Sequence, residues 1–291
     1  MKFFPATTND KHYAQWREQK LAAIYNDSQS RLIHINNAAS LKDSEQKSLI
    51  TACLNDNFAL YHLEDDSQNT KSDIHAFAAQ LGLKNLDGNL CSDQDQLSSI
   101  TVTKHQGQHD YIPYTPKKLS WHTDGYYNTK ARQINGMLLH CVNPAALGGE
   151  TWLMDHELAY LLLRDENPEY INALFAEDVL KIPANIIDGM VIRAEQSGPV
   201  FSVDERGRLH MRYSARLRNI EWKDDELVAD AVAFLKRLWE TGSELIMKHT
   251  LQAGQGVICN NVLHGRTAFE DSGERTRLLF RGRYYDSINC A

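Results

Sequence analysis

The sequence predicts a mainly β protein with flanking helices, built as a double-stranded β-helix of the jelly-roll type. Helical patterns gather in the first part of the chain, and the last part reads as strands only. Strands and helices do not alternate strictly, which argues against a doubly wound parallel sheet. No internal repeat or Pro/Gly/Ser-rich linker divides the chain. We therefore expect one domain over residues 1–291, with residues 1–30 as an N-terminal helical extension.

Apolar periodicity places the individual elements. Helices are predicted at residues 10–27, 40–57, 73–81, 156–164, 168–175 and 223–241. Strands are predicted at 31–35, 58–63, 99–104, 133–142, 150–154, 179–183, 245–250, 257–263 and 277–285, and a hairpin is predicted from 200–203 and 209–213. The polar segments 85–96 and 105–110 are predicted loops, and a lid is the alternative interpretation for the first of them.

Composition narrows the class of protein. The 31 basic and 38 acidic residues give a formal net charge of −7, which argues against binding a nucleic-acid backbone. Five widely spaced cysteines with no Cys-x-x-Cys pair indicate reduced thiols and a cytoplasmic location. The first ten residues lack a signal-peptide pattern, and no apolar run is long enough to span a membrane. We expect a small-molecule substrate and neither a nucleic-acid nor a membrane partner, and we leave homo-oligomerisation open.

The stretch Trp-His-Thr-Asp-Gly-Tyr-Tyr at 121–127 is the strongest candidate site. On a strand, His122 and Asp124 point to the same face. With a second histidine they would form the two-histidine, one-carboxylate triad that binds non-haem iron(II) and leaves positions open. Composition alone predicts about two His-x-Asp/Glu matches, and the chain has two. The other, His62-Leu-Glu64, is interpreted as structural.

His264, in the stretch Asn-Val-Leu-His-Gly-Arg at 261–266, is the candidate third ligand because it lies far along the chain near a strand end. If its strand forms a hairpin with the final one, Arg277 lies close to opposite His264. On the final strand Arg277, Arg281 and Arg283 share one face. Arginines that face a cavity bind carboxylates through two parallel hydrogen bonds. The alternative is a solvated basic face.

These residues carry a family resemblance. The set His122-x-Asp124, Thr151 after Gly-Gly-Glu, His264-Gly-Arg266 and Arg277 resembles the taurine dioxygenase-like family of iron(II)/2-oxoglutarate oxygenases. The resemblance covers most of the chain from Arg31 onward. Within the family it is most similar to γ-butyrobetaine hydroxylase and trimethyllysine hydroxylase, in segments around Tyr114, 119–124 and 138–141. Two departures concern the substrate: the chain is too short for that branch's extra N-terminal domain, and 258–261 lacks the acidic residue and arginine often found before the distal histidine.

The resemblance implies an oxidoreductase that uses iron(II), 2-oxoglutarate and O₂ to hydroxylate an unactivated C–H bond and release succinate. It implies that iron is bound by His122, Asp124 and His264. The retained carboxylate ligand favours hydroxylation over halogenation. It also implies a 2-oxoglutarate site, in which Thr151 helps Arg277 to bind the distal carboxylate and Arg275 is the rival anchor. Arg281 is expected to assist with a carboxylate of the cosubstrate or of the substrate.

The substrate is the most open question. Tyr114, Tyr126 and Tyr127 are candidates for an aromatic cage around a quaternary amine or an amino-acid-like zwitterion, because aromatic faces attract desolvated cations. The plain alternative is that these tyrosines pack in the core or rim. The sequence is also compatible with an anionic substrate (a sulfonate, phosphonate or carboxylate), with a non-catalytic jelly-roll binding protein, and with a zinc hydrolase that uses the same ligands.

Overall fold

The computed structural model describes residues 11–22, 27–65, 67, 69–88, 92–103, 111–273 and 275–288. The chain forms two units. The sheet unit consists of Tyr25–Leu119, Ile134–Leu153 and Met247–Ala291, and the helical unit consists of Met1–Ile24, Ser120–Gln133 and Met154–Ile246. A single domain over 1–291 stays a prediction. The predicted loop at 105–110 and parts of the predicted N-terminal extension lie outside the described residues.

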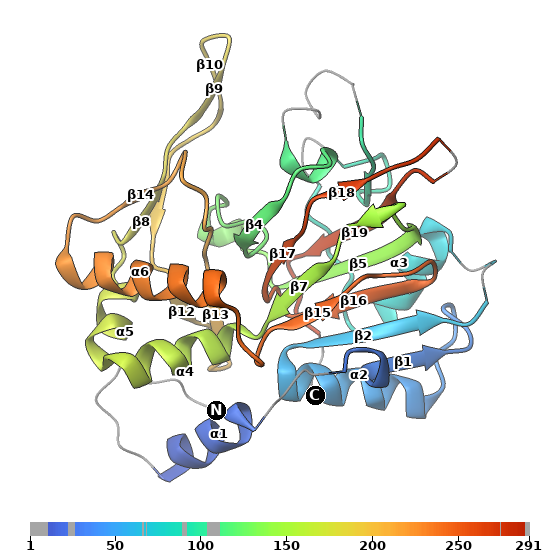
Figure 1. The fold of residues 1–291 in the computed structure, drawn as a ribbon, viewed down its shortest axis with the longest axis horizontal. Helices are drawn as coiled ribbons and strands as arrows, with labels where there is room; N and C mark the ends of the chain where they lie inside the picture. The colour runs from blue at the N-terminus through green and yellow to red at the C-terminus, as the bar shows by residue number, and fades with distance from the viewer. Residues whose placement is uncertain are drawn as a thin grey trace. The chain divides into compact units, whose positions relative to one another are not determined.

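A six-stranded sheet forms most of the sheet unit (Figure 1). Its first two strands are parallel and the remaining neighbours are antiparallel. The central strands are buried over nearly their whole length, as is usual for strands that are covered on both faces. In spatial order the strands are β1 (Leu32–Ile35), β2 (Phe58–Leu63), β16 (Gln255–Cys259), β5 (Gly136–Asn143), β19 (Leu278–Tyr284) and β3 (Ser98–Ile100).

Helices α2 (Asp43–Asp56) and α3 (Lys71–Gln80) pack against this sheet and close one core. Leu49 of α2 and Phe77 of α3 are fully buried in the same cluster as Tyr61 of β2. Helix α2 begins three residues later than predicted. The reason is the capping interaction at Lys42, whose amide donates to the side chain of Glu45.

A second sheet of the same unit contains β15 (Met247–His249), β7 (Thr151–Met154) and β17 (Leu263–Arg266) as neighbours. Strand β6 (Leu147–Gly148) pairs with β18 (Phe269–Glu270). The predicted single strand at 257–263 is wrong, because the chain leaves β16 at Cys259 and turns before β17 begins. The hairpin that was considered between the His264 strand and the final strand does not form, since β17 and β19 belong to different sheets.

The helical unit is built on three helices that contact one another, α4 (His156–Glu166), α5 (Pro168–Leu174) and α6 (Glu226–Thr241). The N-terminal helix α1 (Lys11–Leu21) is attached to α4: Lys20 is buried between the carboxylates of Asp155 and Glu157. Around the helices lie short strands and turns: β4 (Leu119–His122), β8 (Leu180–Ile182), β9 (Asn185–Ile187), β10 (Met190–Arg193), β11 (Gln196–Gly198), β12 (Phe201–Val203), β13 (Leu209–Met211), β14 (Glu221–Trp222) and the 3₁₀ turn Lys130–Arg132.

The hairpin of β9 and β10 was not predicted from the sequence. Its turn residues Asp188 and Gly189 both have positive φ, of 49° and 77°. Asp-Gly between two apolar runs is the sequence signal of a type I′ hairpin, which requires this conformation. The hairpin is short, and its apolar side chains are exposed, including Ile186, Met190 and Val191.

Two predictions from composition, on membrane spans and on cysteines, can be compared with the structure. In the part of the chain that the structure describes, no helix is long and apolar enough to cross a membrane. The three cysteines in that part are buried thiols: Cys53, Cys141 and Cys259. Cys91 and Cys290 lie outside the described residues, and a cytoplasmic location stays a prediction.

A buried ion pair joins the predicted loop at 85–96 to the final strand. Asp87 Oδ2 accepts a hydrogen bond of 2.6 Å from Arg283 Nη2, and both side chains are almost completely buried, with 1% and 3% exposed. The Tyr285 hydroxyl donates to the other carboxylate oxygen at 2.6 Å. The Arg283 guanidinium is therefore already paired with a carboxylate of the protein.

We predict that Asp87→Ala destabilises the protein by about 3–5 kcal/mol, because it leaves the Arg283 guanidinium buried without its carboxylate. Urea denaturation followed by circular dichroism measures the loss. Asp178→Ala removes a carboxylate from an exposed pair with Lys223 and is the control, which should change stability little. Equal effects of the two substitutions would contradict the importance of the buried pair.

Candidate active site

His122 and Asp124 lie together in the helical unit, where β4 ends. Both are buried, with 7% and 5% exposed, and His122 Nε2 lies 3.8 Å from Asp124 Oδ1. Thr123 between them exchanges hydrogen bonds with Tyr213: its amide donates to the tyrosine carbonyl at 3.0 Å, and its hydroxyl accepts from the tyrosine amide at 3.1 Å. This anchoring fixes the alternation that directs the imidazole and the carboxylate to one side, as predicted.

His264 is the second residue of β17 in the sheet unit, and it is also buried, with 7% exposed. The turn that precedes it depends on Asn261, whose φ is 50°. Asparagine adopts this left-handed conformation more readily than most residues. Its side-chain amide donates to the carbonyl of Ile134 at 2.8 Å, which ties the turn to the segment before β5.

The two histidines are held in the same way. His122 Nδ1 lies 2.9 Å from the carbonyl oxygen of Ser120, and His264 Nδ1 lies 2.9 Å from that of Val262. A carbonyl only accepts hydrogen bonds, so Nδ1 carries the hydrogen in each neutral ring and Nε2 carries the lone pair. Metal-binding histidines are typically held by this kind of contact, which orients the ring and fixes its tautomer.

Arg277 is a buried cation in the sheet unit, with 6% exposed. Its guanidinium carbon lies 4.9 Å from the centre of the Phe269 ring, and its backbone amide donates to Asp271 at 2.9 Å. In the described residues no carboxylate or carbonyl accepts a hydrogen bond from its guanidinium. Burial lowers the pKa of Arg277 to about 10, so the side chain stays charged at neutral pH. A buried guanidinium of this kind is suited to bind an anion.

The other sequence candidates for cosubstrate binding differ in burial. Thr151 is buried as the first residue of β7, where it faces His249 of β15. Arg275 is exposed in the turn before β19, and its amide contacts Ser272. Arg281 is half-buried in β19. Burial therefore distinguishes Arg277 from its rival Arg275.

Arg266 connects β17 to the segment that contains Tyr114. Its guanidinium donates to the carbonyl oxygens of Thr115 at 2.9 Å and Lys117 at 2.6 Å, with a longer contact of 3.4 Å to Pro113. Tyr114, in the 3₁₀ turn Ile112–Tyr114, is 2% exposed. Burial and then the charge of Arg277 lower the pKa of Arg266 to about 9. Arg266 is thus a positioning residue for the Tyr114 segment.

Tyr126 and Tyr127 lie in the helical unit, with ring centres 5.2 Å apart and planes nearly perpendicular. Three arginines surround them. Arg216 donates to the Tyr126 hydroxyl at 3.1 Å, Arg212 donates to the Tyr126 carbonyl at 2.7 Å, and the Arg193 guanidinium carbon lies 5.7 Å from the centre of the Tyr127 ring. No carboxylate of the described residues forms an ion pair with any of the three. The sequence interpretation did not single out these arginines.

Comparison with known proteins identifies the class. A family model described as "Taurine catabolism dioxygenase TauD, TfdA family" matches residues 28–282. A uridine-5'-phosphate dioxygenase from Streptomyces sp is 30% identical over 198 residues, which cover 66% of this chain and 70% of that protein. A solved asparagine oxygenase in complex with Fe(II), 2S,3S-3-hydroxyasparagine and succinate superposes with a TM-score of 0.62 at 15% identity, over 94% of this chain and 91% of that one.

A further solved structure, the non-heme iron oxygenase OrfP in complex with Fe and alpha-ketoglutaric acid, has a TM-score of 0.61 at 16% identity. It covers 95% of this chain and 92% of the other chain. These likenesses between distant sequences establish the fold. It is the double-stranded β-helix that the sequence predicted.

The protein is thus an oxygenase with a double-stranded β-helix fold. It belongs to the taurine catabolism dioxygenase TauD, TfdA family. It is an iron(II)- and 2-oxoglutarate-dependent dioxygenase that uses O₂ to hydroxylate an unactivated C–H bond of a small molecule. These relatives do not support a zinc hydrolase or a non-catalytic binding protein. They also do not support the γ-butyrobetaine branch.

Proposed function

We propose that His122, Asp124 and His264 bind the iron(II) of this dioxygenase, and that the two units together form its single catalytic domain. The observation that carries the proposal is that both histidines make the same hydrogen bond, from Nδ1 to the backbone carbonyl two residues earlier. Both rings therefore have Nε2 as the ligating atom. Two imidazoles and one carboxylate fit iron(II) and leave coordination positions for a cosubstrate and O₂.

Bound iron(II) with 2-oxoglutarate and O₂ supplies the oxidising power for C–H hydroxylation. The protein residues bind the cosubstrate and exclude bulk water. We propose that Arg277 binds the distal carboxylate of 2-oxoglutarate, with Thr151 beside it and Arg281 assisting. Support comes from the burial of Arg277, since a buried guanidinium gains from an anion that accepts two hydrogen bonds. The buried state of His122, Asp124 and His264 keeps bulk water from the metal ligands.

We propose an anionic substrate, of the phosphate, sulfonate, phosphonate or carboxylate class. Arg216 supports it, because a cation without a carboxylate partner among the described residues attracts an anion and repels a trimethylammonium group. Arg193 and Arg212 add positive charge, while their guanidiniums already donate to backbone carbonyls. Arg216 is the proposed contact residue, since it is exposed and already donates to the Tyr126 hydroxyl. The name of the Streptomyces relative, uridine-5'-phosphate dioxygenase, gives a phosphorylated nucleoside as its substrate. This also favours an anionic substrate over a quaternary amine.

An aromatic cage of Tyr114, Tyr126 and Tyr127 is less well supported. Arg193 already lies over Tyr127 and Arg216 is bonded to Tyr126, so these rings already interact with cations of the protein. Tyr114 is almost fully buried, which fits core packing as well as a cage.

For the metal ligands, we predict that His122→Ala and His264→Ala each lower bound iron and abolish succinate release. His62→Ala is the matched control and should keep succinate release, because His62 belongs to the competing motif. Anaerobic iron titration and succinate release measure the two effects. Inactivation by His62→Ala with activity retained in His122→Ala would show that the wrong motif was chosen.

For the cosubstrate, Arg277→Lys keeps the charge but loses the planar pair of donors. We predict that the apparent KM for 2-oxoglutarate rises by about tenfold or more, the loss expected for a charge-assisted hydrogen bond. Arg275→Lys is the control and should change this KM little, since Arg275 is exposed. A larger effect at Arg275 would move the anchor by two residues.

For the substrate, matched compounds with and without an anionic group should be compared by their stimulation of succinate release. Uridine 5'-phosphate with uridine is one pair, and taurine with ethanolamine is another. We predict stimulation by the anionic member, and a KM that rises about tenfold in Arg216→Gln, since a charge-assisted hydrogen bond is lost. Arg218→Gln removes a neighbouring exposed charge and should have little effect. Stimulation by trimethylammonium compounds alone would favour the cage instead.

A further inference from the structure

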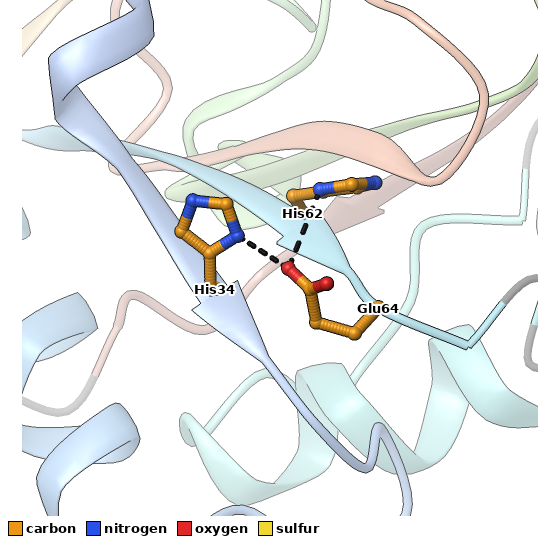
Figure 2. A group of neighbouring side chains, drawn as sticks. All are labelled: His34, His62 and Glu64. Carbon is orange, nitrogen blue, oxygen red and sulfur yellow. Dashed lines mark hydrogen bonds and ion pairs between the residues drawn. The ribbon is translucent and has the colours of Figure 1, made fainter.

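A second set of potential metal ligands lies on the sheet unit, at the edge formed by β1 and β2. The two strands are parallel, and His34 of β1 lies opposite His62 of β2 in their register. Glu64 follows two residues after His62, so it is directed to the same face. Figure 2 shows the two imidazoles and the carboxylate directed toward one another. The sequence interpretation found only the His62/Glu64 half of this cluster.

The distances fit a single ion. One Glu64 carboxylate oxygen is hydrogen-bonded to His34 Nδ1 and lies 3.5 Å from His62 Nδ1. One ligand atom from each residue can be chosen so that all three lie within 4.8 Å of one another. Zinc binds nitrogen and oxygen at about 2.0–2.2 Å, so donor atoms around a tetrahedral zinc lie about 3.3–3.6 Å apart. Small rotations of these exposed side chains can bring the three donor atoms from their present separations to those around a zinc ion.

The backbone beneath the cluster is already fixed. The Glu64 amide donates to the carbonyl of Ile35 at 2.9 Å, and the Leu63 amide donates to that of Gly254 at 2.9 Å. Gly254 also lies against the His62 ring: a Cβ at this position would come within 3.2 Å of Cδ2. The carbonyl anchors and the glycine contact hold the strand end and limit the positions of the His62 ring.

The charges are suited to a cation. The hydrogen bond from His34 lowers the pKa of the Glu64 carboxyl below its ordinary value, so the carboxylate is ionised at neutral pH. The side chains are accessible, with 62%, 29% and 44% exposed for His34, His62 and Glu64. A plain ion pair at such an exposed site contributes little to stability.

We propose that His34, His62 and Glu64 form a second metal site, which binds a zinc(II)-class transition-metal ion at the protein surface. Two imidazoles with one carboxylate favour zinc, copper or nickel over magnesium and calcium, which prefer all-oxygen sites. Three protein ligands leave at least one position for water or for a group from another molecule.

The experiment counts zinc bound per chain by equilibrium dialysis against Zn²⁺. Zinc also binds sites built for iron(II), so the unaltered protein should hold two ions. His34→Ala should hold one. The affinity of the surface site for zinc should fall by more than about 100-fold, because a change in the outer contacts of a ligand alone costs about 10–100-fold. His75→Ala, a half-exposed histidine of α3, should still hold two. Retention of two ions by His34→Ala would overturn the proposal.

A pair of acidic substitutions tests the carboxylate. Glu64→Gln should weaken the surface ion, while Asp65→Asn removes the same charge one residue away and should not. Added Cu²⁺ should displace the zinc and Mg²⁺ should not, whereas displacement by Mg²⁺ would reveal a mere acidic patch and overturn the proposal. Binding should weaken on acidification, because the ligands must be deprotonated to bind a metal.

The test is separate from that of the catalytic site. His264→Ala should lower the zinc count by one while the surface ion remains. His34→Ala should leave succinate release unchanged, because His34 has no place in the proposed catalytic machinery. If His264→Ala keeps both ions, the proposed iron ligands fail and the surface site does not.

Discussion

The burial of arginine side chains is the constraint on which much of the sheet unit depends. Taking a guanidinium out of water costs several kcal/mol unless it is paired or hydrogen-bonded. Arg283 is balanced by the carboxylate of Asp87, and Arg266 by backbone carbonyls of residues 113–117. Arg277 is different, because the described residues give its guanidinium an aromatic face but no acceptor. An anion bound there would offset this cost, so the proposed binding of 2-oxoglutarate by Arg277 would also stabilise the strand end.

The two histidine–carboxylate clusters show how much local sequence can decide. Both motifs place a histidine and an acid two residues apart, and both do so on or after a strand, so their local patterns are equivalent. They differ in burial: His122 and Asp124 are 7% and 5% exposed, whereas the Glu64 side chain is 44% exposed. Burial depends on the rest of the fold, and only the remaining motifs, above all Arg277 and Thr151, allowed the sequence to favour the first cluster.

The elements that sequence predicted well are those whose signals are local. Strand β2 has the predicted bounds because Phe58–Leu63 is a continuous apolar run that ends at a polar turn. The sequence left open whether the His264 strand forms a hairpin with the final strand, because strand pairing is decided by tertiary contacts. The side chain of Asn261, bonded to Ile134, turns the chain so that β17 enters another sheet. Likewise, His34 lies beside His62 only because β1 and β2 pair in parallel. The two histidines are separated by 27 intervening positions in the sequence, so no local pattern predicts that they are neighbours.

The same reasoning explains why the class of reaction was easier to predict than the substrate. The proposed metal ligands belong to short motifs that the chain displays openly. The charges around Tyr126 and Tyr127 come instead from Arg193, Arg212 and Arg216, which lie on separate segments up to 90 residues away. A tyrosine pair read without these neighbours favours a cation through its ring faces. With them, the guanidiniums dominate, since a full charge acts more strongly and over a longer range than a ring quadrupole. The proposal of an anionic substrate therefore rests on the sign of the surrounding charge and not on the presence of aromatic rings.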